Sequence, residues 1–231
     1  MRYAALAALL QPLALIACDR APPAPAATAT TTATTGATQA PRPAGPERLV
    51  LAFGDSLYAG YGLDRGQSLP DAIQARLRAG GVNATVVNAG VSGDTSAAGR
   101  QRLAFTLDNQ ARKPDLVLLG LGGNDVLRQI SPAETRANMT AMLDELKRRD
   151  IPVMLTGMKA PPNLGADYVA RFDSIWPDLA RTYHGTLYPF ILDGVIGDPA
   201  LMQGDRVHPN AAGVAKIADR VAPLVKERLA D

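Results

Sequence analysis

Residues 48–57 read Arg-Leu-Val-Leu-Ala-Phe-Gly-Asp-Ser-Leu, and this stretch decides the fold. Its first six residues form an apolar run without strict alternation of polar residues, which is typical of a strand buried on both faces. Four similar runs follow, at residues 84–88, 115–120, 151–156 and 186–190. We therefore expect five strands in one sheet.

Helix patterns lie between these runs. Ser68 is expected to cap one helix, and Ser131-Pro-Ala-Glu134 predicts a capping box at the start of another. Apolar residues at spacings of three and four predict further helices over residues 168–179 and 214–224. Because strand and helix signals alternate, we expect right-handed crossovers and a parallel sheet covered by helices, a three-layer α/β domain.

The first 46 residues differ from the rest in composition. Residues 1–17 have a basic start and a short apolar stretch, the layout of a secretory signal peptide. Residues 19–46 hold 9 Ala, 7 Thr and 6 Pro but no Val, Ile, Leu or aromatic residue, so they cannot bury enough apolar surface to fold. We expect residues 18–46 to be a disordered tether and residues 47–231 to form one domain.

Composition excludes several classes of protein. With 24 Lys and Arg against 22 Asp and Glu, the chain lacks the basic excess of a nucleic-acid binder. One Cys excludes an intramolecular disulfide, and two His exclude a three-His metal site. A site built from His208, Asp205 and Asp94 would have fewer His ligands than catalytic zinc usually takes, so we expect no metal. Phosphate-binding and dinucleotide motifs are absent, and we expect no cofactor.

Small polar residues are concentrated in four loops. Three of these loops follow expected strands and the fourth precedes the last helix: Gly54–Leu57, Asn88–Thr95, Gly122–Asp125 and Asp205–Asn210. Ligands bind outside the carboxyl ends of parallel strands. Ser56, Gly93, Asn124 and His208 are therefore expected at one edge of the sheet.

These residue types suit nucleophilic catalysis. A serine hydroxyl is a poor nucleophile until a positioned base takes its proton, and histidine suits that task at neutral pH. His184 has no nearby acid, whereas Asp205 lies three residues before His208 in a segment that Pro209 biases away from a helix. Asp205 can therefore orient the imidazole of His208 for attack by Ser56.

The developing oxyanion needs hydrogen-bond donors as well. The backbone N–H groups of Ser56 and Gly93 and the side-chain amide of Asn124 can supply them. A glycine at position 93 suits a backbone that must approach the substrate closely.

The four loops, in this order, resemble the sequence blocks of the SGNH (GDSL) hydrolases over most of residues 48–230. The strings Gly-Asp-Ser-Leu-Tyr-Ala-Gly-Tyr-Gly at 54–62 and Val-Ser-Gly-Asp-Thr-Ser at 91–96 are similar to the bacterial arylesterase, lysophospholipase and acyl-thioesterase branch. The resemblance implies a flavodoxin-like α/β/α sandwich with strand order 2-1-3-4-5. It also implies the roles of nucleophile for Ser56, base for His208 and base partner for Asp205, with an oxyanion hole of Ser56, Gly93 and Asn124.

By the same resemblance, the expected activity is hydrolysis of aryl or short-to-medium acyl esters through an acyl-enzyme, with acyl thioesters or lysophospholipids as further substrates. Two alternatives remain open. One is a carbohydrate or cell-wall O-deacetylase, which the same fold and triad can support. The other is a non-catalytic, lipid-tethered binding module, which would predict loss of Ser56, Asn124 or His208, although all three are present.

The substrate pocket is harder to locate from sequence. Six side chains are expected in or beside the loops at the catalytic edge: Tyr58, Tyr61, Met158, Leu164, Tyr168 and Val207. For each of them, packing between a helix and a loop is the alternative interpretation. The partner we expect is a small-molecule ester or lipid.

The end of the apolar stretch, Leu15-Ile16-Ala17-Cys18, resembles the lipobox of bacterial lipoproteins. The resemblance implies cleavage before Cys18, lipidation of its side chain and a membrane-anchored protein in the periplasm. Asp19 directly after the lipidated Cys favours the inner membrane in enterobacteria. The alternative is a plain cleaved signal with an incidental Cys.

Overall fold

The computed structural model describes residues 42–230, and all of its strands and helices lie between Arg48 and Arg228. The expected signal peptide, Cys18 and residues 18–41 of the tether lie outside the described residues. Within the described range, no helix combines the length and apolar character that crossing a bilayer requires.

Five parallel strands form one sheet in the order β2-β1-β3-β4-β5. Their bounds are Arg48–Gly54 (β1), Ala84–Gly90 (β2), Leu116–Gly120 (β3), Val153–Thr156 (β4) and Thr186–Tyr188 (β5). The predicted strands and strand order are thus confirmed. The two central strands β1 and β3 are almost fully buried, as their uninterrupted apolar runs require.

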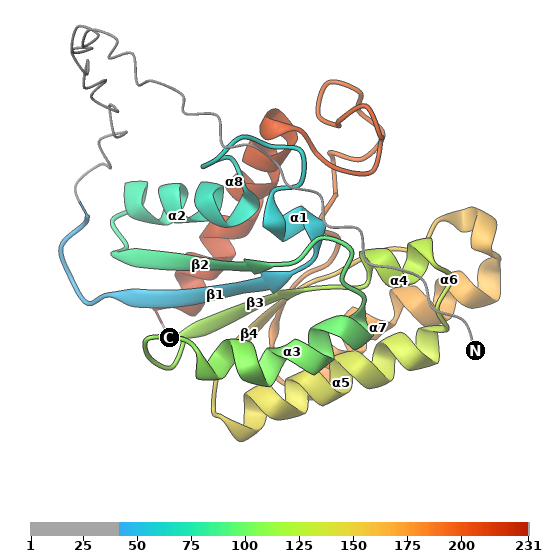
Figure 1. The fold of residues 1–231 in the computed structure, drawn as a ribbon, viewed down its shortest axis with the longest axis horizontal. Coiled ribbons are helices and arrows are strands. Elements are labelled where there is room, and N and C mark those ends of the chain that lie inside the picture. The colour runs from blue at the N-terminus through green and yellow to red at the C-terminus, as the bar shows by residue number, and fades with distance from the viewer. Residues whose placement is uncertain (1–41, 231) are drawn as a thin grey trace, which may run out of the picture. The chain divides into compact units, whose positions relative to one another are not determined.

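Helices cover both faces of the sheet (Figure 1). On one face lie α2 and α8, and on the other α3, α5 and α7. The bounds of the longer helices are Leu69–Ala79 (α2), Ser96–Asp108 (α3), Pro132–Arg148 (α5) and Ala211–Arg228 (α8). The shorter ones are Ser56–Ala59 (α1), Gly123–Leu127 (α4), Ala166–Asp173 (α6) and Ile175–Thr182 (α7), with a 3-10 turn η1 over Pro162–Leu164. The predicted three-layer α/β/α sandwich is confirmed.

The helix starts follow from their caps. Ser68 and Asp71 form a reciprocal capping box at α2, with the Ser68 side chain and backbone both bonded to Asp71. At α5 only half of the predicted box forms: Ser131 Oγ accepts from the backbone N–H of Glu134 at 3.2 Å, and no return bond from the Glu134 side chain is present. The position of the helix start is nevertheless the predicted one.

The helix expected over residues 168–179 is two helices. Ser174 ends α6 and begins α7. Pro177 explains the break, because proline has no N–H to donate to the carbonyl four residues earlier and is tolerated in the first turn of a new helix.

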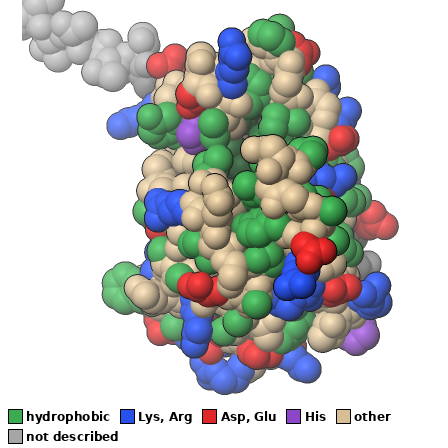
Figure 2. Space-filling view, turned by 90° about the vertical axis from the view of Figure 1, so that its right-hand side faces the viewer, with side chains coloured by type: hydrophobic (Ala, Val, Ile, Leu, Met, Phe, Trp, Pro, Cys, Tyr) green, Lys and Arg blue, Asp and Glu red, His purple; other side chains and the backbone are tan. Residues whose placement is uncertain are grey.

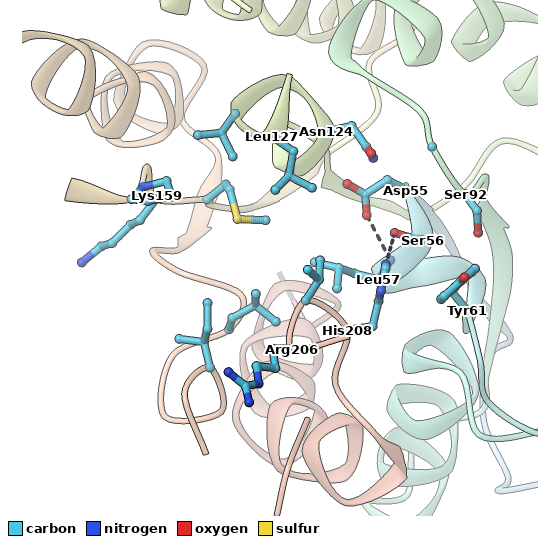
Figure 3. Close-up of a pocket in the computed structure, with 18 of the residues that line it drawn as sticks. Asp55, Ser56, Leu57, Tyr61, Ser92, Asn124, Leu127, Lys159, Arg206 and His208 are labelled. Atoms are coloured by element: carbon cyan, nitrogen blue, oxygen red, sulfur yellow. Dashed lines mark hydrogen bonds between the residues drawn. The ribbon is translucent and has the colours of Figure 1, made fainter. Parts of the chain in front are cut away.

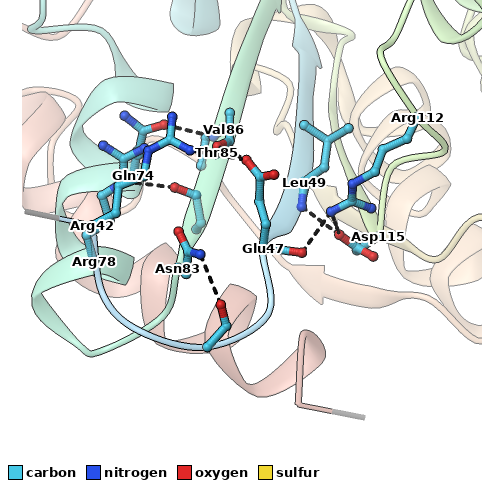
Figure 4. Close-up of polar contacts among 12 residues, drawn as sticks. Arg42, Glu47, Leu49, Gln74, Arg78, Asn83, Thr85, Val86, Arg112 and Asp115 are labelled. Atoms are coloured by element: carbon cyan, nitrogen blue, oxygen red, sulfur yellow. Dashed lines mark hydrogen bonds and ion pairs between the residues drawn. The ribbon is translucent and has the colours of Figure 1, made fainter.

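Exposed polar contacts fasten the chain just before β1 (Figure 4). Asn83 Nδ2 donates to the Gly45 carbonyl at 3.1 Å, and Thr85 Oγ1 donates to Glu47 Oε1 at 2.9 Å. Arg112 donates to the Glu47 carbonyl at 2.8 Å. Gly45, which we expected to belong to the tether, is thus hydrogen-bonded to the domain.

Candidate active site

Three glycines shape the edge of the sheet at which the strands end. Gly54 pairs with Gly90 on one side and with Gly120 on the other, so the three lie in one row across β2, β1 and β3. A Cβ atom at Gly90 would lie 2.3 Å from the Ala59 nitrogen, and one at Gly120 would lie 2.3 Å from Tyr58 Cε2. Only glycines therefore let α1 lie directly against the strand ends.

The buried side chain of Tyr58 anchors α1 to the end of β4. Its side chain is fully buried, and its hydroxyl is 2.8 Å from Thr156 Oγ1 at the end of β4. Burial raises the pKa of Tyr58 well above its ordinary value, so the hydroxyl stays neutral. This anchor holds Ser56, the first residue of α1, at the sheet edge.

A chain of hydrogen bonds joins Ser56, His208 and Asp205. Figure 3 shows its first link, between Ser56 and His208. Ser56 Oγ lies 2.8 Å from His208 Nε2, and His208 Nδ1 lies 2.6 Å from Asp205 Oδ2. This arrangement fits an imidazole that donates Nδ1–H to the carboxylate and accepts the serine hydroxyl proton at Nε2. Residues 152 positions apart in the sequence thus meet in one constellation.

The turn before α8 fixes the carboxylate. Asp205 Oδ1 accepts from the backbone N–H groups of Val207 at 2.9 Å and His208 at 3.0 Å. These bonds, first of all the one from the His208 N–H, hold the pKa of Asp205 at about 2. The Tyr61 ring packs against the imidazole with centroids 4.6 Å apart, which restricts the orientation of the His208 ring.

The expected oxyanion donors lie beside Ser56. Gly93 has a φ of +86°, a left-handed conformation that favours glycine. The side chain of Asn124 in α4 donates one N–H to the Asp94 carbonyl at 2.9 Å, which leaves its second N–H available. The N–H of Ser56 belongs to the first turn of α1, where intrahelical acceptors are absent.

Arg102 of α3 braces this region. Its Nε donates to Asp94 Oδ2 at 2.6 Å and its Nη2 donates to the Gly54 carbonyl at 2.9 Å. The guanidinium carbon lies 3.8 Å from the centroid of the Phe53 ring. Arg102 therefore links the end of β1 to the loop that contains Asp94, whose carbonyl accepts a hydrogen bond from Asn124.

Asp125 is a second brace, and it is fully buried. Its carboxylate accepts from the Ser96 N–H at 2.8 Å, from the Thr135 hydroxyl at 3.0 Å and from the Ser96 hydroxyl. Three helices, α3, α4 and α5, are thereby joined behind Asn124.

Asp55, which the sequence analysis did not single out, is the buried carboxyl nearest the nucleophile in sequence. It caps α1 by accepting from the Leu57 N–H at 3.0 Å and is only 2% exposed. Burial raises its pKa from 3.8 to about 6, and the carboxylates of Asp125 and Asp94 add to the shift. Asp55 could have been predicted as a site residue from its position directly before Ser56, at the end of a buried strand.

A cavity of about 330 Å³ opens beside Ser56 and His208. Apolar side chains form most of its wall: Leu57, Val126, Leu127, Met158, Pro161, Phe190, Leu192, Ile196 and Val207. Figure 2 looks onto this side of the molecule, where hydrophobic side chains line a hollow and charged side chains of both signs lie around it. The wall suits an acyl chain better than a polar sugar.

Three of the six predicted pocket residues line this cavity: Tyr61, Met158 and Val207. The other three do not. Tyr58 is buried beneath α1, and Tyr168 stacks on Phe172 while its hydroxyl donates to the Ile130 carbonyl at 2.8 Å. Leu164 packs against the core from η1.

The segment between β5 and α8 contributes further lining residues that the sequence did not indicate, such as Phe190 and Ile196. This segment has no helix or strand and therefore no periodic pattern that would show which side chains face inward. Among the described residues, no cluster of three or more His, Cys, Asp or Glu is arranged to hold a metal ion.

The chain is similar in sequence to a known family and to several characterised proteins. The model of the GDSL-like lipase/acylhydrolase family matches residues 52–216. Esterase TesA of Pseudomonas aeruginosa is 38% identical over 180 residues, which cover 78% of this chain and 89% of that protein. Thioesterase 1/protease 1/lysophospholipase L1 of Escherichia coli is 36% identical over 180 residues, covering 76% of this chain and 84% of that protein.

Among solved structures, the SGNH-hydrolase family esterase AlinE4 superposes with a TM-score of 0.69 at 53% identity. The match covers 80% of this chain and 97% of that one.

Proposed function

The chain belongs to the GDSL-like lipase/acylhydrolase family and is a carboxylic-ester hydrolase, and from that premise we propose that Ser56 is its nucleophile, activated by His208 and Asp205. One observation carries the proposal: the unbroken hydrogen-bond chain of 2.8 Å and 2.6 Å through the three side chains. Neither distance requires the side chains to move before the proton transfer begins.

In the first step, Ser56 Oγ attacks the ester carbonyl while His208 Nε2 takes the hydroxyl proton. Asp205 stabilises the imidazolium that forms, and its low pKa of about 2 keeps it ionised throughout the working pH range. His208 then returns the proton to the leaving alcohol, which departs and leaves an acyl-enzyme. A water molecule, deprotonated by His208, hydrolyses the acyl-enzyme and restores Ser56.

The negative charge on the carbonyl oxygen is assigned to three donors: the N–H groups of Ser56 and Gly93 and the free N–H of Asn124. The Asp94 carbonyl fixes the Asn124 amide at 2.9 Å, so this donor is oriented before substrate arrives. Donors that need no reorganisation stabilise the transition state most effectively.

The substrate class we propose is esters of aryl alcohols and short-to-medium acyl chains, with acyl thioesters or lysophospholipids as further substrates. The apolar wall of the cavity supports acyl chains, and the names of the relatives include esterase and thioesterase. An O-deacetylase would be expected to offer polar groups for sugar hydroxyls along this wall.

A hydrolysis panel tests the proposal. Purified full-length protein is assayed with p-nitrophenyl esters, acyl-CoA thioesters, lysophospholipids and acetylated sugars, with Ser56→Ala as the control. We expect acyl esters to be preferred over acetylated sugars, and the control to lose on the order of 10⁶-fold in kcat. A preference for acetylated sugars would favour the O-deacetylase.

We also propose that the protein is exported and held at a membrane by lipid on Cys18, with residues 19–46 as the tether, whose end is bound to the domain at Gly45. The support is the composition of residues 1–46, a basic start, a short apolar stretch and an Ala/Thr/Pro-rich segment. Asp19 favours the periplasmic face of the inner membrane. Full-length protein expressed in a bacterium should fractionate with membranes. The variant Cys18→Ser should block lipidation and, with it, lipoprotein maturation. Wild-type protein that is soluble in the periplasm with a free Cys18 thiol would contradict the anchor.

A further inference from the structure

Two cationic side chains, those of Lys159 and Arg206, line the same cavity as Ser56 and His208. Figure 3 shows both of them on the side of the cavity opposite Tyr61 and Ser92. Within the described residues neither cation forms an ion pair, and the Lys159 ammonium lies 5.8 Å from the centroid of the Phe190 ring. The proposed mechanism uses neither of them.

The cavity lining near Lys159 and Arg206 carries no acidic side chain among the described residues, although the ionised Asp205 precedes Arg206 in the chain and binds His208. Asp55 is the one acidic side chain among the described residues that line the cavity. It is buried beside Ser56 and Asn124, on the other side of the cavity from Lys159 (Figure 3). Lys159 and Arg206 are therefore the charged side chains on this side of the described cavity lining.

The backbone positions of Lys159 and Arg206 are fixed, while both side chains are exposed. Met158 and Ala160, which flank Lys159, are buried, and the Ala160 N–H donates to Asp173 Oδ1 at 2.8 Å. Arg206 has a φ of +59°, in the left-handed region that residues with a side chain rarely adopt. Such a conformation persists only where the surrounding structure imposes it.

At Arg206 the surrounding structure is the turn that carries the candidate base. The Arg206 N–H donates to the Gln203 carbonyl at 3.0 Å, and the next two N–H groups donate to Asp205 Oδ1. The Gln203 N–H in turn donates to the His208 carbonyl at 2.8 Å. The guanidinium of Arg206 therefore starts from a backbone position fixed relative to His208.

We propose that Lys159 and Arg206 form an anion subsite, and that the preferred substrates are esters carrying an anionic group separated from the scissile carbonyl by an apolar spacer. The proposal rests on the proposed function, because the subsite has meaning only if Ser56 is the reactive end of the cavity. Apolar side chains, among them Ile196 and Val207, provide the wall along which the spacer lies. Ammonium and guanidinium groups recognise carboxylate and phosphate alike.

That anionic group has two chemical sources. It is either a carboxylate at the far end of the acyl chain or a phosphate on the alcohol part. Two substrate pairs distinguish them, each matched in length. The acyl-side pair is p-nitrophenyl hydrogen adipate against p-nitrophenyl hexanoate. The alcohol-side pair is a lysophosphatidate against the monoacylglycerol with the same acyl chain.

The readout is the ratio of kcat/KM for the anionic substrate to kcat/KM for its neutral partner, measured on full-length protein. A ratio cancels changes in the cavity that affect both substrates of a pair. We expect the double variant Lys159→Met/Arg206→Met to lower this ratio about tenfold in at least one pair. The charge-conserving variant Lys159→Arg/Arg206→Lys should keep most of the ratio.

A control removes one positive charge at a distance from the cavity. Lys113 lies just before β3, at the opposite edge of the sheet, and forms an exposed ion pair with Asp150. Lys113→Met should leave the ratio unchanged. Raising the ionic strength from about 0.05 to 0.5 M should lower the ratio of the wild-type protein but not that of the double variant, because exposed charges are screened.

The substrate pair whose kcat/KM ratio falls identifies the source of the anionic group. A fall confined to the adipate pair assigns a carboxylate on the acyl chain, and a fall confined to the lysophosphatidate pair assigns a phosphate on the alcohol part. Unchanged ratios in both pairs, with the neutral esters still hydrolysed, would overturn the subsite and leave the esterase assignment standing. If neither of the two neutral esters is hydrolysed, the proposed function and the subsite are both overturned.

Discussion

Asp55 sits directly before the nucleophile and is the most perturbed carboxyl of the site, with a pKa of about 6 against an ordinary value of 3.8. A raised pKa in the folded state means that the group favours folding below about pH 3.8. That contribution is lost as the pH rises through about 6. Over that range the ionisation of Asp55 costs about 3 kcal/mol of folding free energy.

The variant Asp55→Asn removes this titration while retaining an oxygen that accepts from the Leu57 N–H. Relative to wild type, its free energy of unfolding should rise by about 3 kcal/mol between pH 3.5 and pH 7.5. Urea unfolding at the two pH values measures the difference. An equal difference between variant and wild type at both values would show that Asp55 titrates normally.

Asn124 is the side-chain donor assigned to the oxyanion. Because the oxyanion exists only in the transition state and the tetrahedral intermediate, Asn124→Ala should lower kcat about 10²–10³-fold and leave KM nearly unchanged. Steady-state kinetics with a p-nitrophenyl ester separates the two parameters. A change confined to KM would assign Asn124 to ground-state binding instead.

At the scale of elements, the contact between α1 and the ends of β2, β1 and β3 sets the position of the nucleophile. A Cβ atom at Gly90 would lie 2.3 Å from the backbone nitrogen of Ala59, which cannot yield without moving α1. Gly90→Ala should therefore destabilise the fold by about 1–3 kcal/mol and also lower kcat, because Ser56 moves with α1.

Gly204 provides the control for that substitution. A Cβ atom there meets no atom within 4 Å, and its φ is not positive. Gly204→Ala should leave the melting temperature within about a degree of wild type, in keeping with surface substitutions generally. If Gly90→Ala were equally harmless in stability and kcat, the close packing of α1 on the strand ends would not be what places Ser56.

Elements with a clear apolar period or a capping residue were predictable. The five strands and the starts of α2 and α5 were found because each depends on local sequence. The α3 helix was missed because its buried positions Ser96 and Gly99 are not large apolar residues and leave no clear stripe. The break between α6 and α7 was missed because apolar spacing continues across Pro177.

At the scale of the whole molecule, a parallel sheet brings the loops after its strands to one edge, whatever their separation in the sequence. The relation among Ser56, Asn124 and His208 could therefore be inferred before the structure. The pocket could not, because its wall depends on side-chain directions in the irregular segment between β5 and α8. Tyr58 illustrates the limit: it lies two residues from Ser56 yet faces the core.

The most direct test of the account is covalent labelling with a fluorophosphonate, whose phosphorus is attacked by an activated serine with loss of fluoride. Peptide mass spectrometry should find the label on Ser56 of the wild-type protein. In a folded His208→Ala variant, the labelling rate should fall about 10³-fold or more, because no base remains to take the proton. Label on another residue, or Ser56 labelled at an undiminished rate in His208→Ala, would contradict the assignment of Ser56 as a nucleophile activated by His208.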